Sequence, residues 1–230
     1  MHLCLFCSCR RYDYANRFCI TGFQMALTIY GSPMSRAFRV LWMARELGLQ
    51  YENIPLDPRA GDTRKPDYLK INPNGHVPAI VDGDYVLWES LAINLYLAKK
   101  HGGPLAPTNL AEEGKALARS MWALTELEDN VVTLVGSVLM PPERKPNAAR
   151  VESAKEGLNT PLRVLDAALA HSQYLLGSRF TVADLNVAGV VAGLVIAKFE
   201  LDAWPNVRAW LAACTGRKAF AELGLRNPAR

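Results

Sequence analysis

The feature that most constrains the fold is a change of pattern at the Gly- and Pro-rich stretch GGPLAPTN (102–109). Before this stretch, short β-branched and apolar segments accompany helical repeats, whereas after it we find only helical patterns. Strands confined to one part of the chain are typical of an α+β unit followed by a separate helical unit. The sequence therefore predicts two domains joined by a linker.

The first unit is predicted to have the order β-α-β-(α)-β-β-α. LTIY (27–30) and YENIP (51–55) are strand candidates that a helix connects, so they are expected to pair in parallel. VPAIVDGDYVLWE (77–89) has the pattern of an antiparallel hairpin with an Asp-Gly turn. The first helix is predicted from one apolar face, which consists of Ala37, Val40, Leu41, Ala44 and Leu47.

The second unit is predicted to be all-helical. Long helical segments are expected over 111–138 and 148–170, and a further helix after Pro205. Thr181 and Asp184 have the spacing of a capping box, with Asp in place of Glu, and are expected to start a helix without contacting a substrate. The predicted domains are 25–102 and 111–230, with 103–110 as the linker.

Residues 1–24 differ from the rest because they hold four of the five cysteines. The segment does not resemble a secretory signal, and we expect a disordered extension or a start codon misread ahead of Met25. Cys4, Cys7 and Cys9 leave a metal site as an alternative, but no second His/Cys pair recurs at ligand spacing. We therefore expect no metal.

Charge and apolar patterning narrow the possible partners. The longest apolar run has 11 residues (187–197), which is too short to cross a bilayer, so no membrane association is expected. A net charge of +4 without a basic run gives no case for nucleic-acid binding. After residue 24 the chain has a single cysteine, which is typical of proteins in a reducing cytosol, so a cytoplasmic location is expected.

Four motifs between Met25 and the end of the chain resemble those of the cytosolic glutathione transferases, and they occur in the same order as in that family. They are YGSPMSRAFRVLWMARELGLQYE, NPNGHVPAIVDGDYVLWES, the Gly/Pro linker and FTVADL. The resemblance, which is closest to serine-type theta- or phi-like bacterial members, implies a thioredoxin-like N-terminal domain that binds glutathione. It also implies a helical domain that helps to bind a small electrophile, a homodimer and a role in detoxification.

Such an enzyme must ionise the glutathione thiol. A thiol pKa of about 8.5 leaves about 3% thiolate at pH 7. One hydroxyl donor contributes roughly 1.5–3 kcal/mol and a helix N-terminus about 0.3–1 kcal/mol, which together could lower the pKa to about 6–7. A hydroxyl at a helix start is therefore sufficient for this chemistry.

The resemblance implies that Ser35 is that catalytic hydroxyl, since it lies four residues before Arg39. Its alternative role is helix capping, but Phe38 stands where a capping box needs Glu or Gln. Ser32, followed by Pro33, makes a good N-cap and leaves Ser35 free. Arg39 could help to hold the thiolate, pair with a carboxylate or lie on the surface, and the sequence does not choose.

The remaining binding residues also follow from the resemblance. Val77 would pair through its main chain with the cysteinyl part of glutathione, after a cis bond to Pro78. Ser90, expected to cap the next helix, would bind the γ-glutamyl carboxylate, and Glu89 its ammonium group. His76 could reach the tripeptide or remain in solvent.

Other functions within the fold are possible. A thiol–disulfide enzyme needs a cysteine at position 35, and none lies near this turn. A glutathione-dependent isomerase or peroxidase activity stays open, as does a non-catalytic ligandin-type interaction module that binds glutathione. The presence of Ser35 and the Glu89–Ser90 pair favours the transferase.

Overall fold

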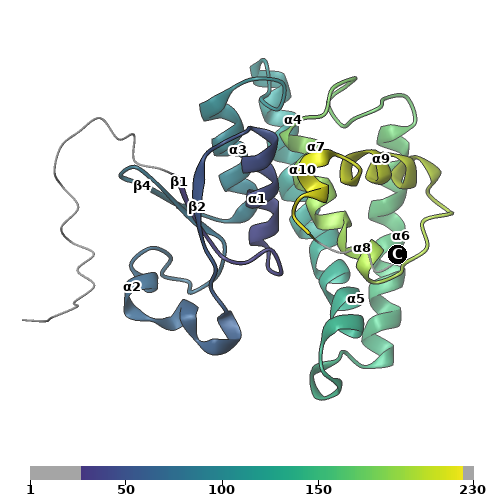
Figure 1. The fold of residues 1–230 in the computed structure, drawn as a ribbon. Coiled ribbons are helices and arrows are strands. Elements are labelled where there is room, and N and C mark those ends of the chain that lie inside the picture. The colour runs from purple at the N-terminus through teal and green to yellow at the C-terminus, as the bar shows by residue number, and fades with distance from the viewer. Residues whose placement is uncertain (1–26, 225–230) are drawn as a thin grey trace, which may run out of the picture.

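The computed structural model of the protein describes residues 27–224, which form a small sheet with helices and then a group of helices (Figure 1). The predicted extension 1–24, with its cysteines, lies outside the described residues. The α+β order followed by an all-helical domain confirms the predicted fold class.

The N-terminal domain is built on a four-stranded sheet with the order β2-β1-β3-β4. Its strands are β1 (Leu27–Tyr30), β2 (Tyr51–Ile54), β3 (Ala79–Asp82) and β4 (Tyr85–Trp88). The parallel pair β1–β2 and the antiparallel hairpin β3–β4 are as expected, and β1 also pairs with β3 in antiparallel orientation. Leu27 and Ile29 of β1 alternate into the core, so the register of β1 is fixed by burial.

Three helices accompany the sheet: α1 (Ala37–Glu46), α2 (Pro66–Leu69) and α3 (Ser90–His101). Four residues of the predicted apolar face, Ala37, Val40, Leu41 and Ala44, are buried in α1, whereas Leu47 is half-buried just after its end. Gly48 follows with a φ of +65°, a left-handed conformation that suits glycine. Between β2 and α2 the chain forms two 3₁₀ turns, Pro58–Ala60 (η1) and Asp62–Arg64 (η2).

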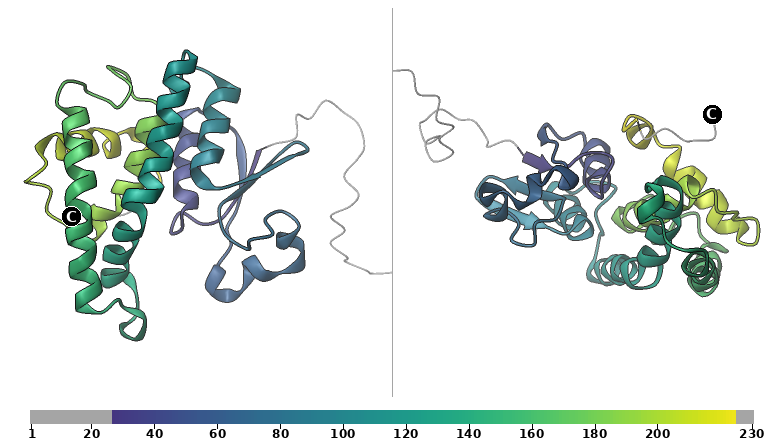
Figure 2. Two further views of the ribbon diagram at one scale, coloured as in Figure 1. Left: turned by 180° about the vertical axis from the view of Figure 1, so that it is seen from behind. Right: turned by 90° about the horizontal axis from the view of Figure 1, so that it is seen from below.

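The C-terminal domain is helical, and its longest helical run lies on the side of the domain that faces the sheet and its helices (Figure 2). This long helix consists of α4 (Leu110–Trp122), a π-helical segment η3 (Ala123–Glu128) and α5 (Asp129–Leu139). The remaining elements are η4 (Pro142–Arg144), α6 (Ala148–Leu169), α7 (Val182–Val191), α8 (Gly193–Ile196), α9 (Pro205–Thr215) and α10 (Lys218–Ala221). The predicted helices are present, but the π-helical geometry of η3 and the short elements η4, α8 and α10 were not predicted.

α7 lies at the centre of the molecule, and all ten of its residues are buried. It packs against α1 and α3 of the first domain and against α4 and α9 of the second. A buried polar chain crosses this contact: Asn94 Nδ2 donates to Asn186 Oδ1 (2.9 Å), and Asn186 Nδ2 donates to Ser120 Oγ (2.9 Å). Buried amides must find partners, so this chain favours one relative placement of the domains.

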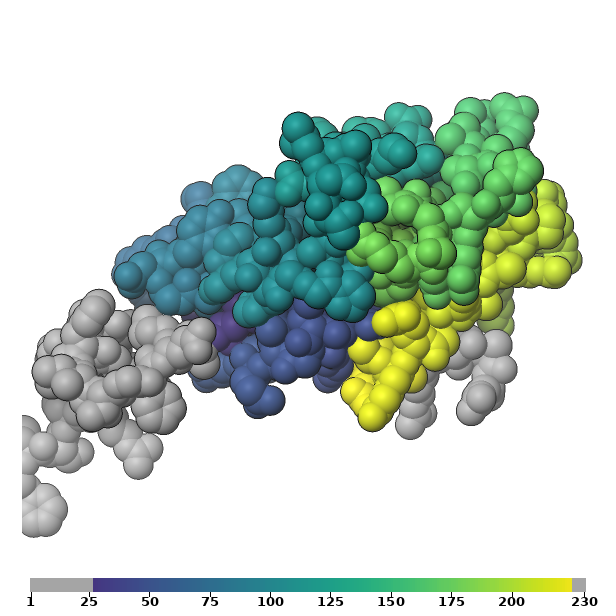
Figure 3. All heavy atoms as spheres, turned by 90° about the horizontal axis from the view of Figure 1, so that it is seen from above, coloured from purple at the N-terminus to yellow at the C-terminus, as the bar shows by residue number. Residues whose placement is uncertain are grey.

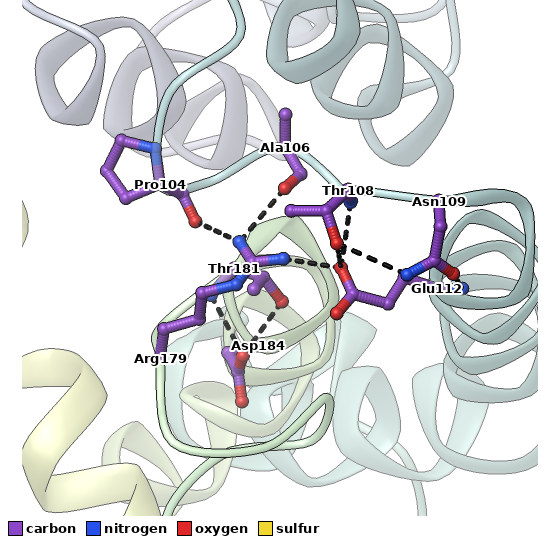
Figure 4. A network of polar contacts seen from close by, with 8 residues as sticks. All are labelled: Pro104, Ala106, Thr108, Asn109, Glu112, Arg179, Thr181 and Asp184. Atoms are coloured by element: carbon purple, nitrogen blue, oxygen red, sulfur yellow. Dashed lines mark hydrogen bonds and ion pairs between the residues drawn. The ribbon is translucent and has the colours of Figure 1, made fainter.

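Arg179 fixes the linker between the domains (Figure 4). Its guanidinium donates to the carbonyl oxygens of Pro104 (2.5 Å) and Ala106 (2.9 Å), and it forms an ion pair with Glu112 at the start of α4. Glu112 also accepts from the main-chain N–H of Thr108 (2.8 Å). The Gly/Pro stretch is therefore an ordered connection.

The C-terminal residues return to the first domain, and the space-filling view shows them lying against it (Figure 3). Arg217 contacts Glu46 of α1 through two bonds of 2.7 Å, and its guanidinium lies 4.1 Å from the centroid of the Phe180 ring. Bidentate contacts of this kind fix orientation as well as distance. Together with the linker contacts, these bonds fix the C-terminal segment and the linker against the rest of the molecule.

Candidate functional site

A pocket of about 560 Å³ lies between the two domains. Its walls come from the turn between β1 and α1, the segment before β3, the start of α3 and the π-helical segment η3. The lining residues are Ser35, Arg36, Arg39, Pro58, Asn72, Gly75, His76, Val77, Pro78, Glu89, Ser90, Leu124 and Glu128. The structure thus brings together all the residues that the sequence assigned to glutathione.

Ser35 lies in the turn that precedes α1. Its Oγ donates to the carbonyl oxygen of Ser32 (2.8 Å) and accepts from the main-chain N–H of Ala37 (3.2 Å). The expectation that Ser32 caps the helix is wrong, because the helix begins only at Ala37 and Ser35 takes the free N–H there. The hydroxyl of Ser35 is therefore oriented by the helix start and half-buried at the pocket wall.

Gly31 allows this turn to lie close to the neighbouring segment. Its φ is +121°, and a Cβ there would lie 2.7 Å from the Cβ of Ala37 and 3.1 Å from that of Val77. A side chain at this position would push the turn away from Val77. The sequence analysis did not single out Gly31, although a glycine directly after a strand was a usable signal.

The Val77–Pro78 peptide bond is cis. Neither the main-chain N–H nor the carbonyl of Val77 is hydrogen-bonded to another residue within 27–224. The preceding loop is fixed by Asn72 and Tyr68, which donate to the carbonyl oxygen of His76 at 2.7 Å and 2.6 Å. The His76 side chain is exposed at the pocket rim.

Burial raises the pKa of Tyr68 to about 12, so its hydroxyl remains a donor across the physiological pH range. Asn72, whose exposed fraction is 2%, also accepts from the main-chain N–H of Asn74 (3.1 Å). These two residues shape the loop that presents Val77. Sequence reasoning missed both, because their role depends on contacts within the folded loop.

Glu89 and Ser90 differ from the expectation at the helix start. Ser90 is the first residue of α3 and not its N-cap, a position that Glu89 occupies with a φ of +73°. A non-glycine residue with positive φ is strained, and such strain concentrates at functional sites. Because Ser90 already has a helical backbone, its hydroxyl instead accepts from Arg39 Nη1 (3.4 Å), while the side chain of Glu89 is exposed.

Arg39 is buried and pairs with a carboxylate, so of the three alternatives that the sequence left open it is not a surface arginine. Its exposed fraction is only 4%, and Nη2 donates to Glu128 Oε2 (2.8 Å) while Nε donates to the carbonyl oxygen of Gly189 (3.1 Å). Glu128 Oε1 in turn accepts from Arg36 Nε (2.5 Å). The first domain thereby contacts the helical domain through one carboxylate shared by two guanidinium groups.

The charges of this cluster stabilise one another. Burial alone would raise the pKa of Glu128, but the positive charges and hydrogen bonds of Arg39 and Arg36 outweigh it and lower that pKa below its ordinary value. Burial also lowers the pKa of Arg39, against the opposing effect of Glu128. Because its pKa is lowered, Glu128 is ionised at neutral pH and can pair with both guanidinium groups.

Glu128 lies in the π-helical segment, a geometry that is rare and often occurs at functional sites.

Within residues 27–224, we find no group of three or more His, Cys, Asp or Glu side chains placed to hold a metal ion. Over the same residues, none of the helices has the length and apolar character that a membrane span needs.

Comparisons with known proteins agree with this architecture. The family model described as glutathione S-transferase, N-terminal domain, matches residues 25–99, and the corresponding C-terminal domain model matches residues 148–213. Glutathione S-transferase 3 of Zea mays is 38% identical, over 84% of this chain and 91% of that protein.

Solved structures give the same result. A theta class glutathione S-transferase from Xanthomonas axonopodis pv. citri, with glutathione bound, superposes with a TM-score of 0.81 at 32% identity, covering 87% of this chain and 98% of that one. A structure of glutathione S-transferase III in apo form gives 0.76 at 36% identity, covering 89% and 98%. With both domain models, this level of identity and this fold, the chain belongs to the glutathione S-transferase family of enzymes.

Proposed function

We propose that this protein binds glutathione in the interdomain pocket and transfers it to a small electrophile, with Ser35 as the catalytic hydroxyl. The observation that carries this proposal is that Ser35 lines the same pocket as Val77 and the start of α3. A tripeptide that contacts Val77 and α3 would place its thiol within reach of that hydroxyl.

The hydrogen bonds of Ser35 suit this role. The hydroxyl can rotate from the carbonyl of Ser32 towards a thiolate while its oxygen still accepts from the N–H of Ala37. Accepting one hydrogen bond strengthens a hydroxyl as a donor in the next. A charged acceptor makes the new bond worth about 1.5–3 kcal/mol, enough to lower a thiol pKa by about one to two units.

The other pocket residues would hold the two ends of glutathione. The unpaired main-chain groups of Val77 can form two bonds to the cysteinyl residue, as in an added strand. The N-terminus of α3 and the Ser90 hydroxyl can bind the γ-glutamyl carboxylate, and the exposed Glu89 its ammonium group. His76, at the pocket rim, would contact the remaining end of glutathione, which points outward.

In the reaction, the thiolate sulfur attacks an electrophilic carbon and a C–S bond forms. For a halide substrate, the bond from carbon to halogen breaks and the halide leaves with its electron pair. Two further lining residues would contact the electrophile: Leu124 of the helical domain and Arg36, which follows Ser35 in the turn. No metal or covalent enzyme intermediate is required for this step.

We further propose a cytoplasmic homodimer that acts in detoxification. Three side chains of the edge strand β4 support the dimer, because Tyr85, Val86 and Trp88 are large and apolar yet exposed by 46%, 42% and 38%. An exposed edge strand with such side chains is a surface that proteins usually cover. The only cysteine among the described residues, Cys214, is buried and free, which suits a reducing compartment.

The test is the ultraviolet absorbance of the thiolate of bound glutathione, measured against pH in the full chain. We expect a thiol pKa of about 6–7 that rises by about a unit or more in Ser35→Ala. Ser32→Ala is the matched control in the same turn, and it should leave the thiol pKa unchanged. Tight binding with a thiol pKa near 8.5 in all three proteins would instead favour a non-catalytic binding module.

A further inference from the structure

Arg36 has a feature that the proposed function does not use. It follows Ser35 directly and lines the same pocket, and its Nε donates to Glu128 Oε1 at 2.5 Å. Its two terminal NH₂ groups make no hydrogen bond to any residue within 27–224. The side chain is 53% exposed, so these donors are accessible from the pocket mouth.

This geometry differs from that of an ordinary surface arginine. A free side chain loses several rotatable bonds when it binds a ligand, whereas the ion pair with Glu128 already restricts Arg36 at Nε. The remaining NH₂ groups of the planar guanidinium match the two oxygens of a carboxylate. Arg36 is therefore a partly ordered donor pair beside the proposed sulfur position.

The charge balance points to the same kind of ligand. Arg36 and Arg39 share the single carboxylate of Glu128, so this wall of the pocket carries an excess of one positive charge. The other acid that lines the pocket, Glu89, lies at the start of α3, where the ammonium group of glutathione is proposed to bind. An anion near Arg36 would balance the excess charge.

We propose that Arg36 is a specificity-determining residue and that the preferred electrophiles carry a carboxylate on a small apolar body. The carboxylate would accept from the free NH₂ groups of Arg36, and the apolar body would contact Leu124 of the π-helical segment, which is 40% exposed. This inference rests on the proposed function, because it assigns the second substrate of the same site.

The test compares two benzylic chlorides, 4-(chloromethyl)benzoate and its neutral methyl ester, in glutathione conjugation by the full chain. In both compounds the glutathione sulfur displaces chloride, and they differ only in the carboxylate or methyl ester on the opposite side of the ring. We expect Arg36→Ala to lower kcat/KM for the carboxylate about tenfold and to change that for the ester less than about twofold. Arg36→Lys keeps the positive charge but not the paired NH₂ donors, so its kcat/KM for the carboxylate should lie between the values of the unsubstituted protein and of Arg36→Ala.

Arg59→Ala is the control for net charge, because Arg59 is exposed and does not line the pocket. It should leave the preference between acid and ester unchanged. Equal losses for acid and ester in Arg36→Ala would overturn the inference. A raised KM for glutathione with both electrophiles would also overturn it, since Arg36 would then bind a carboxylate of glutathione.

A binding measurement separates this inference from the proposed function. The unreactive 4-methylbenzoate is titrated into the protein saturated with glutathione, with methyl 4-methylbenzoate for comparison. We expect the Kd of the acid to rise about tenfold in Arg36→Ala and that of the ester to stay the same. Selective binding without any conjugation would refute the transferase while supporting the site, and binding of the acid that is unaffected by Arg36→Ala would refute the site.

Discussion

Two buried carboxyl groups of the helical domain, Glu128 and Asp184, are surrounded by opposite kinds of partner. Glu128, in the π-helical segment, faces the guanidinium groups of Arg36 and Arg39 across the domain boundary. Asp184, near the start of α7, faces only neutral donors, and its exposed fraction is 0%. The pKa of Glu128 is lowered, whereas burial raises the pKa of Asp184 against the effect of its hydrogen bonds.

The difference separates a group of the pocket from a group of the core. Asp184 accepts four hydrogen bonds from three residues of its own domain and does not line the interdomain pocket. Glu128 joins two domains, lines the candidate site and leaves the donors of one partner accessible. A buried acid surrounded by neutral donors stabilises local structure, whereas one that shares two cations can also orient them for a ligand.

The largest effect is expected at the core group. Asp184→Ala removes the acceptor for the N–H groups of Leu175 and Thr181, the Thr181 hydroxyl and the indole N–H of Trp210, all within 2.8–3.0 Å. Four lost bonds at about 1 kcal/mol each predict a loss of about 4 kcal/mol in the free energy of unfolding. Denaturant-induced unfolding measures it.

The matched control is Asn147→Ala at the exposed start of α6, where Asn147 Oδ1 accepts from the N–H of Arg150 at 2.8 Å. That substitution should cost about 1 kcal/mol. A cost for Asp184→Ala as small as that of the control would contradict the assigned structural role of Asp184.

The next effect is expected at the pocket group. Glu128→Gln keeps one acceptor but leaves the charge of buried Arg39 without a counter-charge, so we expect a loss of about 2–3 kcal/mol. Because Arg39 also contacts Ser90, the KM for glutathione should rise as well. Glu126→Gln, in the same π-helical segment but exposed, is the control and should change neither quantity. Loss of stability with an unchanged KM would separate Glu128 from the site.

The dependence of stability on pH should have opposite signs at the two groups. The lowered pKa of Glu128 stabilises the fold above the ordinary value of 4.5, and this contribution is lost as the pH falls through the folded pKa. The raised pKa of Asp184 favours the fold below its ordinary value of 3.8, and that contribution is lost as the pH rises through the folded pKa.

Acid unfolding therefore distinguishes the two groups. Between pH 7 and the acid limit, Glu128→Gln should lose stability less steeply than the unsubstituted protein, because a contribution that acid removes is already missing. Asp184→Asn should lose stability more steeply as the pH falls, because this variant lacks the stabilisation that protonation of Asp184 adds at low pH. Parallel curves of unfolding free energy against pH for all three proteins would contradict both pKa assignments.

The sequence analysis succeeded where the relevant pattern is local. The apolar face of α1 and the hairpin of β3 and β4 follow from spacing alone, because each element buries one face. It erred at helix starts, where several hydroxyls compete: Ser32 and Ser35 both suit an N-cap, and only the folded turn shows that Ser35 takes the N–H of Ala37. The start of α3 at Ser90 was misassigned for the same reason.

The far wall of the pocket could not be predicted in this way. Glu128 lies 89 residues from Arg39, and no local pattern joins an arginine of one domain to an acid of another. The segment ALTELE (123–128) also fits an ordinary α-helical repeat, so its π-helical geometry leaves no signal in the spacing. Long-range charge pairing, unlike periodicity, becomes visible only when the domains are in place.

The smallest effects are expected when one donor is removed from each carboxylate. Thr181→Val deletes a fully buried hydroxyl that contacts Asp184 Oδ2 at 3.0 Å, and should cost about 1–2 kcal/mol. Arg36→Ala removes a half-exposed partner of Glu128, and solvent screening should hold its cost below about 1 kcal/mol. Unfolding of both variants in the same denaturant series tests the order. If Arg36→Ala cost more than Thr181→Val, Arg36 would be a structural partner of Glu128, whereas the expected order leaves its donors available for a ligand.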